Sequence, residues 1–536
     1  MKQPQMNTDK TNQIERAPCP GPLPAWRGEG GPREAGPGEG SVLNPCPSVV
    51  KMALPDLIEI VPLDKPVRAE ITVPGSKSIT NRALILAALA DGEVTLEGAL
   101  WSEDTQIMVE CLQELGFMVN VAPDPNEICN RTITVYGQGG KVPGGGTAEN
   151  PLELFVGNAG TVARFLAALV CLGKGVYRLH GVSRMHERPQ AALFKALREL
   201  GYRVDSPNDK LPATIFGGRA DPALRDQDAR QRVPTKQCSV SIEESSQFAS
   251  ALLLCAKHGG WEVNVVGENA EESSYVAMTL KLMEAFPHHG GRFQIEPDAS
   301  SGSYFWAAGQ LEVEQKTDCQ EEKSFTLSAS CLPTVRVANW PKSNWQIDEG
   351  FLLQFSQLEM RTDAFTKTML GNWATDEIVA QYRKSANLQP LTISRLRDLG
   401  DSIMTAIVIS PFLIEPVKFT DLGRLRVQEC ERVVALRTEL TKCGAKVVEE
   451  GDTLTVWPSK LHGEEIETYN DHRMAMCFAI LGLKVPGIKI KNPACVKKTF
   501  PNFFQKLAAP PPKGLGATIL DARTGRKLKE EELFAE

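Results

Sequence analysis

The stretch Pro74-Gly75-Ser76-Lys77 leads directly into a run of mostly small apolar residues, ITNRALILAALA at 79–90. Five further short turns lead into similar runs; they lie at 157–161, 245–247, 299–301, 399–401 and 469–473. A cation stands near the turn in at least four of the six. The unpaired N–H groups and the positive end of the dipole make each helix N-terminus favourable for an anion. The repetition therefore predicts a repeated fold whose helix N-termini meet at an anion-binding cleft.

The length and charge of the chain limit its class. A chain of 536 residues is too long for one hydrophobic core and predicts two or three domains. Its net charge of −7 does not attract nucleic acid or an anionic membrane, so anion binding must come from local cations. The 13 cysteines form no Cys-x-x-Cys pair, which favours reduced thiols in the cytoplasm over disulfides or a zinc site. No apolar run reaches the ~18 residues that span a bilayer.

The periodicity of the apolar residues predicts repeated α/β units. Strand and helix patterns alternate along the first unit, at 57–73 (strand), 76–90 (helix), 94–97 (strand) and 105–115 (helix), and two strands follow near 119 and 133. This unit recurs after Gly157 and after Ser245, with a period of about eighty residues. Similar elements return after Glu296, interrupted by an insertion at about 325–395. Two groups of three units predict two similar domains.

The two ends of the chain differ from these units. Residues 1–54 are rich in Pro, Gly and charge and are expected to be a disordered extension, with Met52 as a candidate translation start. Loss of the segment before Met52 is expected to leave activity nearly unchanged. Residues 509–536 begin with consecutive prolines followed by mixed charge, and are expected to form a surface appendage.

Charged residues near the turns are candidates for binding anions. Lys77 and Arg82 flank the start of the first helix, where they can hold a phosphate or carboxylate, or be solvated around a capping turn. Arg184 and Arg188 lie four residues apart, so they can clamp a carboxylate together or pair with Glu187. Neither pair decides between the two interpretations by itself.

Asp401 and Glu429 are the best candidates for proton transfer, because each lies beside a cation-bearing segment. Burial in a dry cleft is expected to raise the pKa of such a carboxylate toward the working pH. The alternative is that Asp401 caps a helix and Glu429 pairs with Arg426 or Arg432. Histidine is scarce and none has a second ligand at metal spacing, so neither a zinc site nor a serine-hydrolase triad is expected.

Several motifs in a fixed order are more specific than any of these residues alone. They read PGSKS at 74–78, NAGT at 158–161, RMHERP at 184–189, SSQ at 245–247, NDHRMAM at 470–476 and KTFP at 498–501. Together they resemble the 5-enolpyruvylshikimate-3-phosphate synthase family, over about residues 57–507.

The resemblance implies an α/β fold of two similar domains, each built from three βαβαββ units as an inside-out α/β barrel, with the active site in the interdomain cleft. The first domain would comprise 55–74 plus 296–508, and the second 75–295. The implied reaction moves the carboxyvinyl group of phosphoenolpyruvate to the 5-hydroxyl of shikimate 3-phosphate and releases phosphate. The family implies no cofactor and no metal. A monomeric, cytoplasmic enzyme of aromatic amino-acid biosynthesis is expected.

The resemblance also implies roles for individual residues. The contacts to shikimate 3-phosphate would be Lys77, Ser78, Arg82, Ser245, Ser246, Gln247, Asp401 and Gln428. Those to phosphoenolpyruvate would be Lys77, Gly160, Arg184, Gln247, Arg432, Arg473 and Lys498. Asp401 resembles the base that takes the 5-hydroxyl proton, and Glu429 the residue that handles the proton at the methylene carbon, with Lys77 as a helper.

The chain departs from the family pattern at a few positions. Gln428 replaces a substrate-contacting lysine, and Arg424, where many members carry Asn, is expected to restore the missing positive charge. Phe165 stands where Pro often follows the arginine of the glycine-turn helix, and no Pro precedes Tyr275. These changes concern the shape of the pocket and leave the implied reaction intact.

Three other functions compete with this interpretation. The sister enolpyruvyl transferase acting on UDP-N-acetylglucosamine shares fold and chemistry but lacks the SSQ and NDHR motifs. RNA 3′-phosphate cyclase uses related units but needs a nucleotide-accepting His and a basic surface. An inactive anion-binding homologue or scaffold is disfavoured by the presence of Lys77, Asp401, Glu429 and Lys498.

Overall fold

The six predicted helix starts are confirmed in a computed structural model, which describes residues 54–218, 236–267, 273–310, 335–354, 391–413 and 415–535. The six helices are α1 (Lys77–Leu89), α3 (Gly160–Leu169), α6 (Gln247–Gly259), α8 (Ala299–Gln310), α12 (Ile403–Ile409) and α14 (His472–Gly482). Every residue of α3, α12 and α14 is buried. Helices with apolar side chains on all sides belong inside a core, and the strands cover them.

One four-stranded sheet shows the repeating unit in full. It contains β14 (Leu391–Ser394), β15 (Val417–Thr420), β16 (Val447–Glu450) and β17 (Thr453–Val456), and α12 and α13 (Arg432–Lys442) connect the first three strands. The chain order is therefore βαβαββ. β14 pairs with β15 in parallel, and β17 pairs antiparallel with both β15 and β16. The parallel pair requires a helical crossover, whereas the last two strands form a hairpin.

Three further sheets repeat this pairing, with one parallel pair followed by two antiparallel pairs. In spatial order, the strands of the first of these sheets are β6 (Leu152–Phe155), β7 (Val176–His180), β9 (Ala213–Phe216) and β8 (Arg203–Asp205). Those of the second are β12 (Gly291–Gln294), β3 (Glu93–Leu100), β5 (Asn130–Tyr136) and β4 (Val119–Pro123). Those of the third are β18 (Glu465–Ile466), β19 (Ile488–Lys491), β1 (Leu57–Ile60) and β20 (Ile519–Asp521). Two parallel pairs complete the described strands, β10 (Gln237–Ser241) with β11 (Glu262–Val266) and β13 (Val335–Val337) with β2 (Ala69–Ile71). The remaining α-helices of the described residues are α2 (Glu103–Glu114), α4 (Ser183–Glu187), α5 (Ala191–Glu199), α7 (Ser274–Ala285) and α15 (Phe503–Ala508).

The buried apolar side chains form two separate clusters, and each defines a lobe. The first lobe uses described residues that lie between 54 and 73 and between 304 and 535, and the second uses described residues between 79 and 295. Among the described residues, each lobe contains two four-stranded sheets and one two-stranded pair around its buried helices. The sheets of the described residues do not close into one barrel. We propose that the domain boundaries lie at 74–75 and 295–296, where the chain passes from one cluster to the other.

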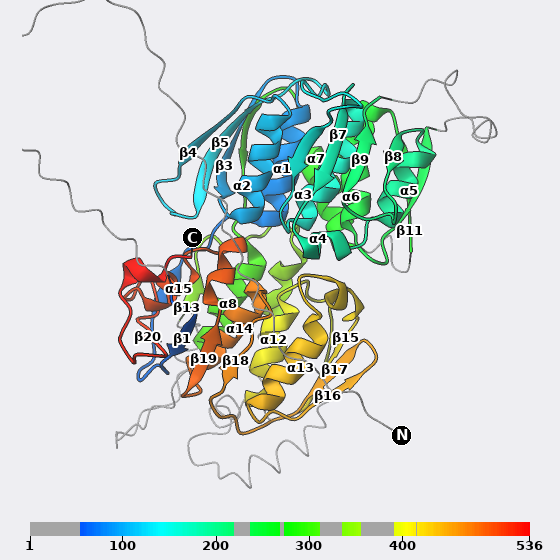
Figure 1. Ribbon diagram of the computed structural model, residues 1–536. Helices are drawn as coiled ribbons and strands as arrows, with labels where there is room; N and C mark the ends of the chain where they lie inside the picture. Colours follow the sequence, from blue (N-terminus) through cyan, green and yellow to red (C-terminus); the bar gives the residue numbers. More distant parts are fainter. Residues whose placement is uncertain are drawn as a thin grey trace, which may run out of the picture. The chain divides into compact units, whose positions relative to one another are not determined.

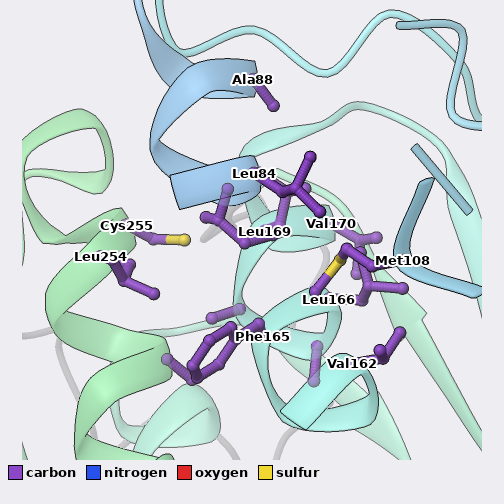
Figure 2. Packing of buried hydrophobic residues seen from close by; sticks show 14 of the residues in the cluster. Leu84, Ala88, Met108, Val162, Phe165, Leu166, Leu169, Val170, Leu254 and Cys255 are labelled. Atoms are coloured by element: carbon purple, nitrogen blue, oxygen red, sulfur yellow. The ribbon is translucent and has the colours of Figure 1, made fainter. Parts of the chain in front are cut away.

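The second lobe is held together by direct packing between its buried helices. Leu84 of α1 lies beside Leu169 of α3, and Leu254 of α6 is on another side of the same cluster, which also includes Ala88 and Leu166 (Figure 2). All five side chains are at most 2% exposed. The many alanines let the helices approach closely, which holds their N-termini at one end of the lobe.

The C-terminal segment 509–536 is part of the first lobe, so the prediction of a surface appendage is wrong. β20 pairs antiparallel with β1, and Figure 1 shows the dark-blue β1 among the elements of the C-terminal part of the chain. Leu515, Ile519 and Leu533 are at most 1% exposed and belong to the first cluster. The consecutive prolines end α15, and the chain then returns along the sheet edge, where its apolar residues find partners.

Part of the predicted insertion at 325–395 also belongs to the fold. Residues 311–334 and 355–390 lie outside the described residues. Between them, β13 pairs in parallel with β2, and the segment that follows carries the buried Asp348. Asp348 accepts hydrogen bonds from Gly400 N at 2.8 Å and from Ser402 N at 3.1 Å. This segment therefore fixes the turn that presents Asp401. Of the predicted extension 1–54, only Leu54 is described.

The C-terminal strand gives a direct test of its structural role. Ile519→Ala removes a side chain that is 1% exposed between β1 and the core. We expect the free energy of unfolding to fall by about 2 to 4 kcal/mol, as for other buried large-to-small changes. Lys513→Ala, at an exposed position of the same segment, is the control and should change it by less than about 0.5 kcal/mol. Equal effects of the two changes in chemical denaturation would contradict the assignment of this segment to the core.

Candidate active site

One pocket collects residues from both lobes. Eight of its lining residues are Lys or Arg and only four are Asp or Glu. Four of the helix starts predicted from the sequence reach it, since Lys77 begins α1, Gly160 begins α3, Gln247 begins α6, and Arg473 lies in the first turn of α14. Both the side chains and the helix dipoles therefore give this pocket a positive potential.

Arg432 is the buried centre of the first-lobe side of the pocket. Its side chain is 1% exposed and lies at the start of α13. Its Nε atom donates to Asp471 at 2.7 Å, and its terminal nitrogens lie 2.8 Å from Glu429 and 3.9 Å from Asp401. It also donates to the side-chain oxygen of Gln428. A guanidinium presents five N–H donors in a plane, which allows one side chain to hold several acceptors at once.

Asp401 is held as a carboxylate by arginines. Arg395 donates to it at 2.9 Å, and Arg473 lies 3.2 Å away. Burial alone would raise the pKa of Asp401, but Arg473, Arg395 and Arg432 outweigh burial and lower that pKa below its ordinary value. The expectation of a raised pKa for Asp401 is therefore wrong. The pKa is lowered because the cleft that excludes water also places three arginines beside this carboxylate.

Glu429 has a similar environment. Its carboxylate lies 2.8 Å from Arg432 and 3.2 Å from Lys498. Burial acts to raise the pKa of Glu429, but Lys498, Arg432 and other nearby cations outweigh it and lower the pKa well below the ordinary value. The sequence left pairing with Arg426 open, but Arg426 instead contacts acids on the surface of the lobe. Both candidate proton-transfer groups are thus charged at neutral pH.

His472 is the buried neutral group of the pocket. Burial, followed by the charges of Lys77 and Arg473, lowers the pKa of His472 well below its ordinary value. Neither ring nitrogen has a hydrogen-bond partner in the described residues. Asp471 lies beside it and accepts from Arg473 N at 2.9 Å, which caps α14. The cap fixes the direction in which Arg473 enters the pocket.

The second-lobe side is anchored by α1. Lys77 forms an ion pair with the nearly buried Asp104 at 3.1 Å. Arg82 donates to Thr279 at 2.8 Å and to Ser250 at 3.0 Å, and its guanidinium lies 5.3 Å from the ring centre of Phe165. Burial lowers the pKa of Arg82 to about 10, which keeps it charged at neutral pH. The departure at Phe165 therefore supplies a cation–π partner for this arginine.

The glycine turn before α3 permits close approach of two arginines. A Cβ atom on Gly160 would lie 2.3 Å from Arg164 and 2.6 Å from Arg188. Arg164 donates to the side-chain oxygen of Gln247 at 2.9 Å, and Arg188 donates to the carbonyl of Asn158 at 2.9 Å. A side chain at position 160 would displace these two guanidinium groups.

Most of the predicted site residues line this pocket. They are Lys77, Ser78, Arg82, Gly160, Ser245, Ser246, Gln247, Asp401, Gln428, Glu429, Arg432 and Arg473. Lys498 lies behind the lining and reaches Glu429. Arg184 is 41% exposed; it pairs with Glu187 at 2.6 Å and donates to the carbonyl of Gln428 at 3.2 Å. Arg184 therefore pairs with Glu187, which was the alternative to clamping a carboxylate. Its hydrogen bond to Gln428 also connects the two lobes.

Sequence reasoning gave no role to several lining residues. Arg164 lies four residues, or about one helical turn, after Gly160. Its distance in sequence from the glycine turn therefore indicated that it could reach the pocket. Arg395 lies six residues before Asp401, outside every motif, and only the fold brings it to the site. Tyr275 lies in the first turn of α7 and lines the same pocket.

Comparison with known proteins decides the family. Residues 62–507 match the model of the family described as EPSP synthase (3-phosphoshikimate 1-carboxyvinyltransferase). The chain belongs to the EPSP synthase family. Proteins of Trichormus variabilis and Opitutus terrae, both named 3-phosphoshikimate 1-carboxyvinyltransferase, are each 36% identical to it. The alignments cover 84% and 85% of this chain and 98% of each relative.

Solved structures agree on the fold of the EPSP synthase family. The structure of EPSP synthase from Acinetobacter baumannii matches with a TM-score of 0.59 at 19% identity, covering 86% of this chain and 99% of that one. The enolpyruvyl transferase NikO from Streptomyces tendae matches with a TM-score of 0.55 at 14% identity, covering 89% and 99%. The prediction of the enolpyruvyl transferase fold is confirmed. Within the described residues, no cluster of metal-ligating side chains occurs, and no helix is both long and apolar enough to cross a membrane.

The charge of Glu429 predicts a pH-dependent contribution to stability. Its folded-state pKa lies below the unfolded value of about 4.3, so its stabilising effect is complete above that pH and is lost as pH falls through the folded pKa. Glu429→Gln should lower the free energy of unfolding at pH 7 by about 2 to 4 kcal/mol, because Arg432 and Lys498 lose an anionic partner.

The difference between Glu429→Gln and the unaltered protein should then shrink below about pH 4. Denaturant unfolding of the variant and of the unaltered protein between pH 7 and pH 3 measures the two free energies of unfolding and the difference between them. Glu450→Gln, at an exposed position, is the control and should follow the unaltered protein throughout. A difference that stays constant down to pH 3 would show that the charge of Glu429 is not the stabilising element.

Proposed function

We propose that the protein transfers the carboxyvinyl group of phosphoenolpyruvate to the 5-hydroxyl of shikimate 3-phosphate, releasing phosphate. The observation that supports it most is the pocket itself, in which eight cations face four anions within a chain 36% identical to proteins named for this reaction. Both substrates are multiply charged anions. A site with this excess of positive charge therefore fits both of them at once.

The second lobe supplies the proposed contacts to the acceptor substrate. Lys77, Ser78 and Arg82 lie on the first two turns of α1, and Ser245 and Ser246 precede α6. The free N–H groups of these helix starts add donors for a carboxylate or a phosphate. On the first lobe, Asp401 is the proposed contact to the ring hydroxyls and Gln428 lies nearby in the same pocket.

The proposed phosphoenolpyruvate contacts lie on the other side of the pocket. Arg432 and Arg473 come from the first lobe and Gln247 from the second. Gly160 allows Arg164 and Arg188 to enter the same region, so these two arginines join the proposed set. Arg184 and Lys498 reach this region through their contacts with the Gln428–Glu429 segment.

The addition step requires one proton to leave the 5-hydroxyl and another to be added to the methylene carbon of phosphoenolpyruvate. Asp401 accepts the proton of the 5-hydroxyl as its oxygen bonds to the central carbon of phosphoenolpyruvate. A proton is added at the methylene carbon, and Glu429, in its protonated form, is the proposed donor, with Lys77 as helper. Loss of phosphate from the tetrahedral intermediate returns that proton, so the carboxyvinyl group is regenerated. Binding of anions beside Glu429 and Asp401 raises their pKa values, which prepares both groups for proton transfer.

The decisive assay is phosphate release by the purified full chain. Release should require shikimate 3-phosphate and phosphoenolpyruvate together and should not occur with either alone. Replacing the acceptor with UDP-N-acetylglucosamine tests the sister reaction and should give no release. Phosphate release with one substrate alone, or with the sugar nucleotide, would overturn the proposal.

Asp401→Asn tests the proposed base. The amide keeps the shape of the side chain but cannot accept the proton, so kcat should fall by ~10²- to 10⁴-fold with a smaller change in KM. Asp91→Asn, at an exposed position, is the control and should keep full activity. Near-normal turnover of Asp401→Asn across pH would exclude Asp401 as the base, even if phosphate release established the reaction.

A further inference from the structure

Asp401 lies between two backbone N–H groups that one buried carboxylate holds. Asp348 is 3% exposed and accepts from Gly400 N at 2.8 Å and from Ser402 N at 3.1 Å. It also accepts from the hydroxyl groups of Ser402 and Ser300. A Cβ atom on Gly400 would lie 3.0 Å from a carboxylate oxygen of Asp348, so glycine leaves room for this close contact. Asp348 therefore fixes the backbone on both sides of Asp401.

The segment that carries this carboxylate also contacts the second lobe, and we call its residues 343–348 the strap. Trp345 stacks on Phe293 of β12, with ring centres 6.0 Å apart and ring planes 7° from parallel. The indole packs against the second cluster, although the chain on either side of the strap belongs to the first lobe. Lys281 of α7 donates across the lobes to the carbonyl of Asn344 at 2.9 Å. The strap is thus bonded to both lobes.

The middle of the strap is held at the point where the chain crosses between the lobes. Gln346 is 5% exposed, and its side chain donates to the carbonyl of Pro297 at 2.8 Å and accepts from Ala299 N at 3.0 Å. Ser343 donates to Glu296 at 2.9 Å. Because the strap is bonded along its length, a displacement at its contact with the second lobe is carried to its other end.

The arginines that contact Asp401 have a different effect. Arg395, Arg432 and Arg473 all belong to the same lobe as Asp401. They fix the charge and the orientation of the carboxylate within that lobe, but they do not set its distance from the second lobe. The strap differs from them because it also contacts the second lobe, through Trp345.

We propose that the strap sets the position of Asp401 relative to the second lobe, with Trp345 and Asp348 as positioning residues for the proton transfer. This inference rests on the proposed function. The 5-hydroxyl belongs to a substrate whose proposed contacts lie mostly on the second lobe, whereas Asp401 belongs to the first. Proton transfer requires about 2.6 to 3.2 Å between the two oxygen atoms. A connection that is bonded to both lobes keeps the base at that distance.

Trp345→Ala tests the strap through turnover of the full chain. Loss of the ring stack should lower kcat by about 10- to 100-fold and change KM for shikimate 3-phosphate by less than about threefold, because a displacement of about 1 Å impairs proton transfer more than binding. Trp345→Phe keeps an aromatic ring and should restore most of kcat. Asp348→Asn, at the other end of the strap, should also lower kcat more than it changes KM.

Trp340→Ala is the matched control. It removes an indole from the same part of the chain, but Trp340 packs on Trp306 within the first lobe, with ring centres 5.8 Å apart. This variant should keep kcat within about threefold, even where it lowers the melting temperature. The melting temperature of each variant reports whether it is folded, and unchanged kcat in folded Trp345→Ala would overturn the strap.

A second background separates positioning from general damage to the site. Asp401→Asn has already lost the proposed base, so adding Trp345→Ala to it should lower kcat by less than about twofold. A merely structural defect would lower kcat by the same factor whether or not the base is present. Losses of equal size in the two backgrounds would therefore contradict the role of Trp345 as a positioning residue.

Hydrogen exchange tests the same connection without turnover. Asp348 protects the amides of Gly400 and Ser402, so a peptide spanning 399–404 should exchange at least about 10-fold faster in Trp345→Ala than in the unaltered protein or in Trp340→Ala. Unchanged protection in folded Trp345→Ala would also overturn the strap. A failure of the proposed reaction would appear separately as absent phosphate release, and the exchange rates would still decide whether the strap holds this turn.

Discussion

Arg432 is the cation on which the first-lobe half of the site depends. It lies within 4 Å of three carboxylates, Asp471, Glu429 and Asp401, although its own side chain is 1% exposed. Each of these acids belongs to a different segment of the chain. Asp471 caps α14, and Glu429 precedes α13. Removal of the guanidinium would leave Asp471 buried without its charged partner, which costs several kcal/mol.

The network holds a pocket that remains positively charged after all its internal pairs are counted. Lys77 is paired with Asp104, Glu429 with Lys498, and Asp401 with Arg395, yet Arg424 keeps no anionic partner in the described residues. Such an arrangement lowers the stability of the protein, because like charges are concentrated in a partly dry space. An anionic substrate that binds there offsets the repulsion between these like charges. The free energy of that repulsion therefore contributes to the affinity for the substrate.

The sequence predicted the parts of the fold that local patterns determine. All six turn-to-helix transitions begin helices, since a polar turn before an apolar helical run is a local signal. The role of residues 515–533 could not be predicted in this way, because the partner strand of Ile519 lies at the other end of the chain, at Ile60. The proline run suggested an appendage, and only the long-range pairing of β20 with β1 shows otherwise.

The site was predictable where motifs place residues at helix starts, and not where tertiary contacts do. Lys77, Gly160 and Arg473 lie at or near helix N-termini and reach the pocket as expected. Arg395 reaches it through the end of a strand and has no signature in the sequence. The direction of the pKa shift at Asp401 was missed for the same reason, because it depends on three cations from separate segments.

A double-mutant cycle on Arg432 and Asp471 tests most directly whether this buried pair organises the site. The free energy of unfolding is measured by denaturant titration for the full chain, for Arg432→Met, for Asp471→Asn and for the double variant. We expect the first change alone to cost about 3 to 5 kcal/mol, since it leaves a fully buried carboxylate without its partner. The double variant should then be more stable than the sum of the two losses predicts, by about 1 to 3 kcal/mol. Effects that add to within about 0.5 kcal/mol would contradict the central place of this ion pair.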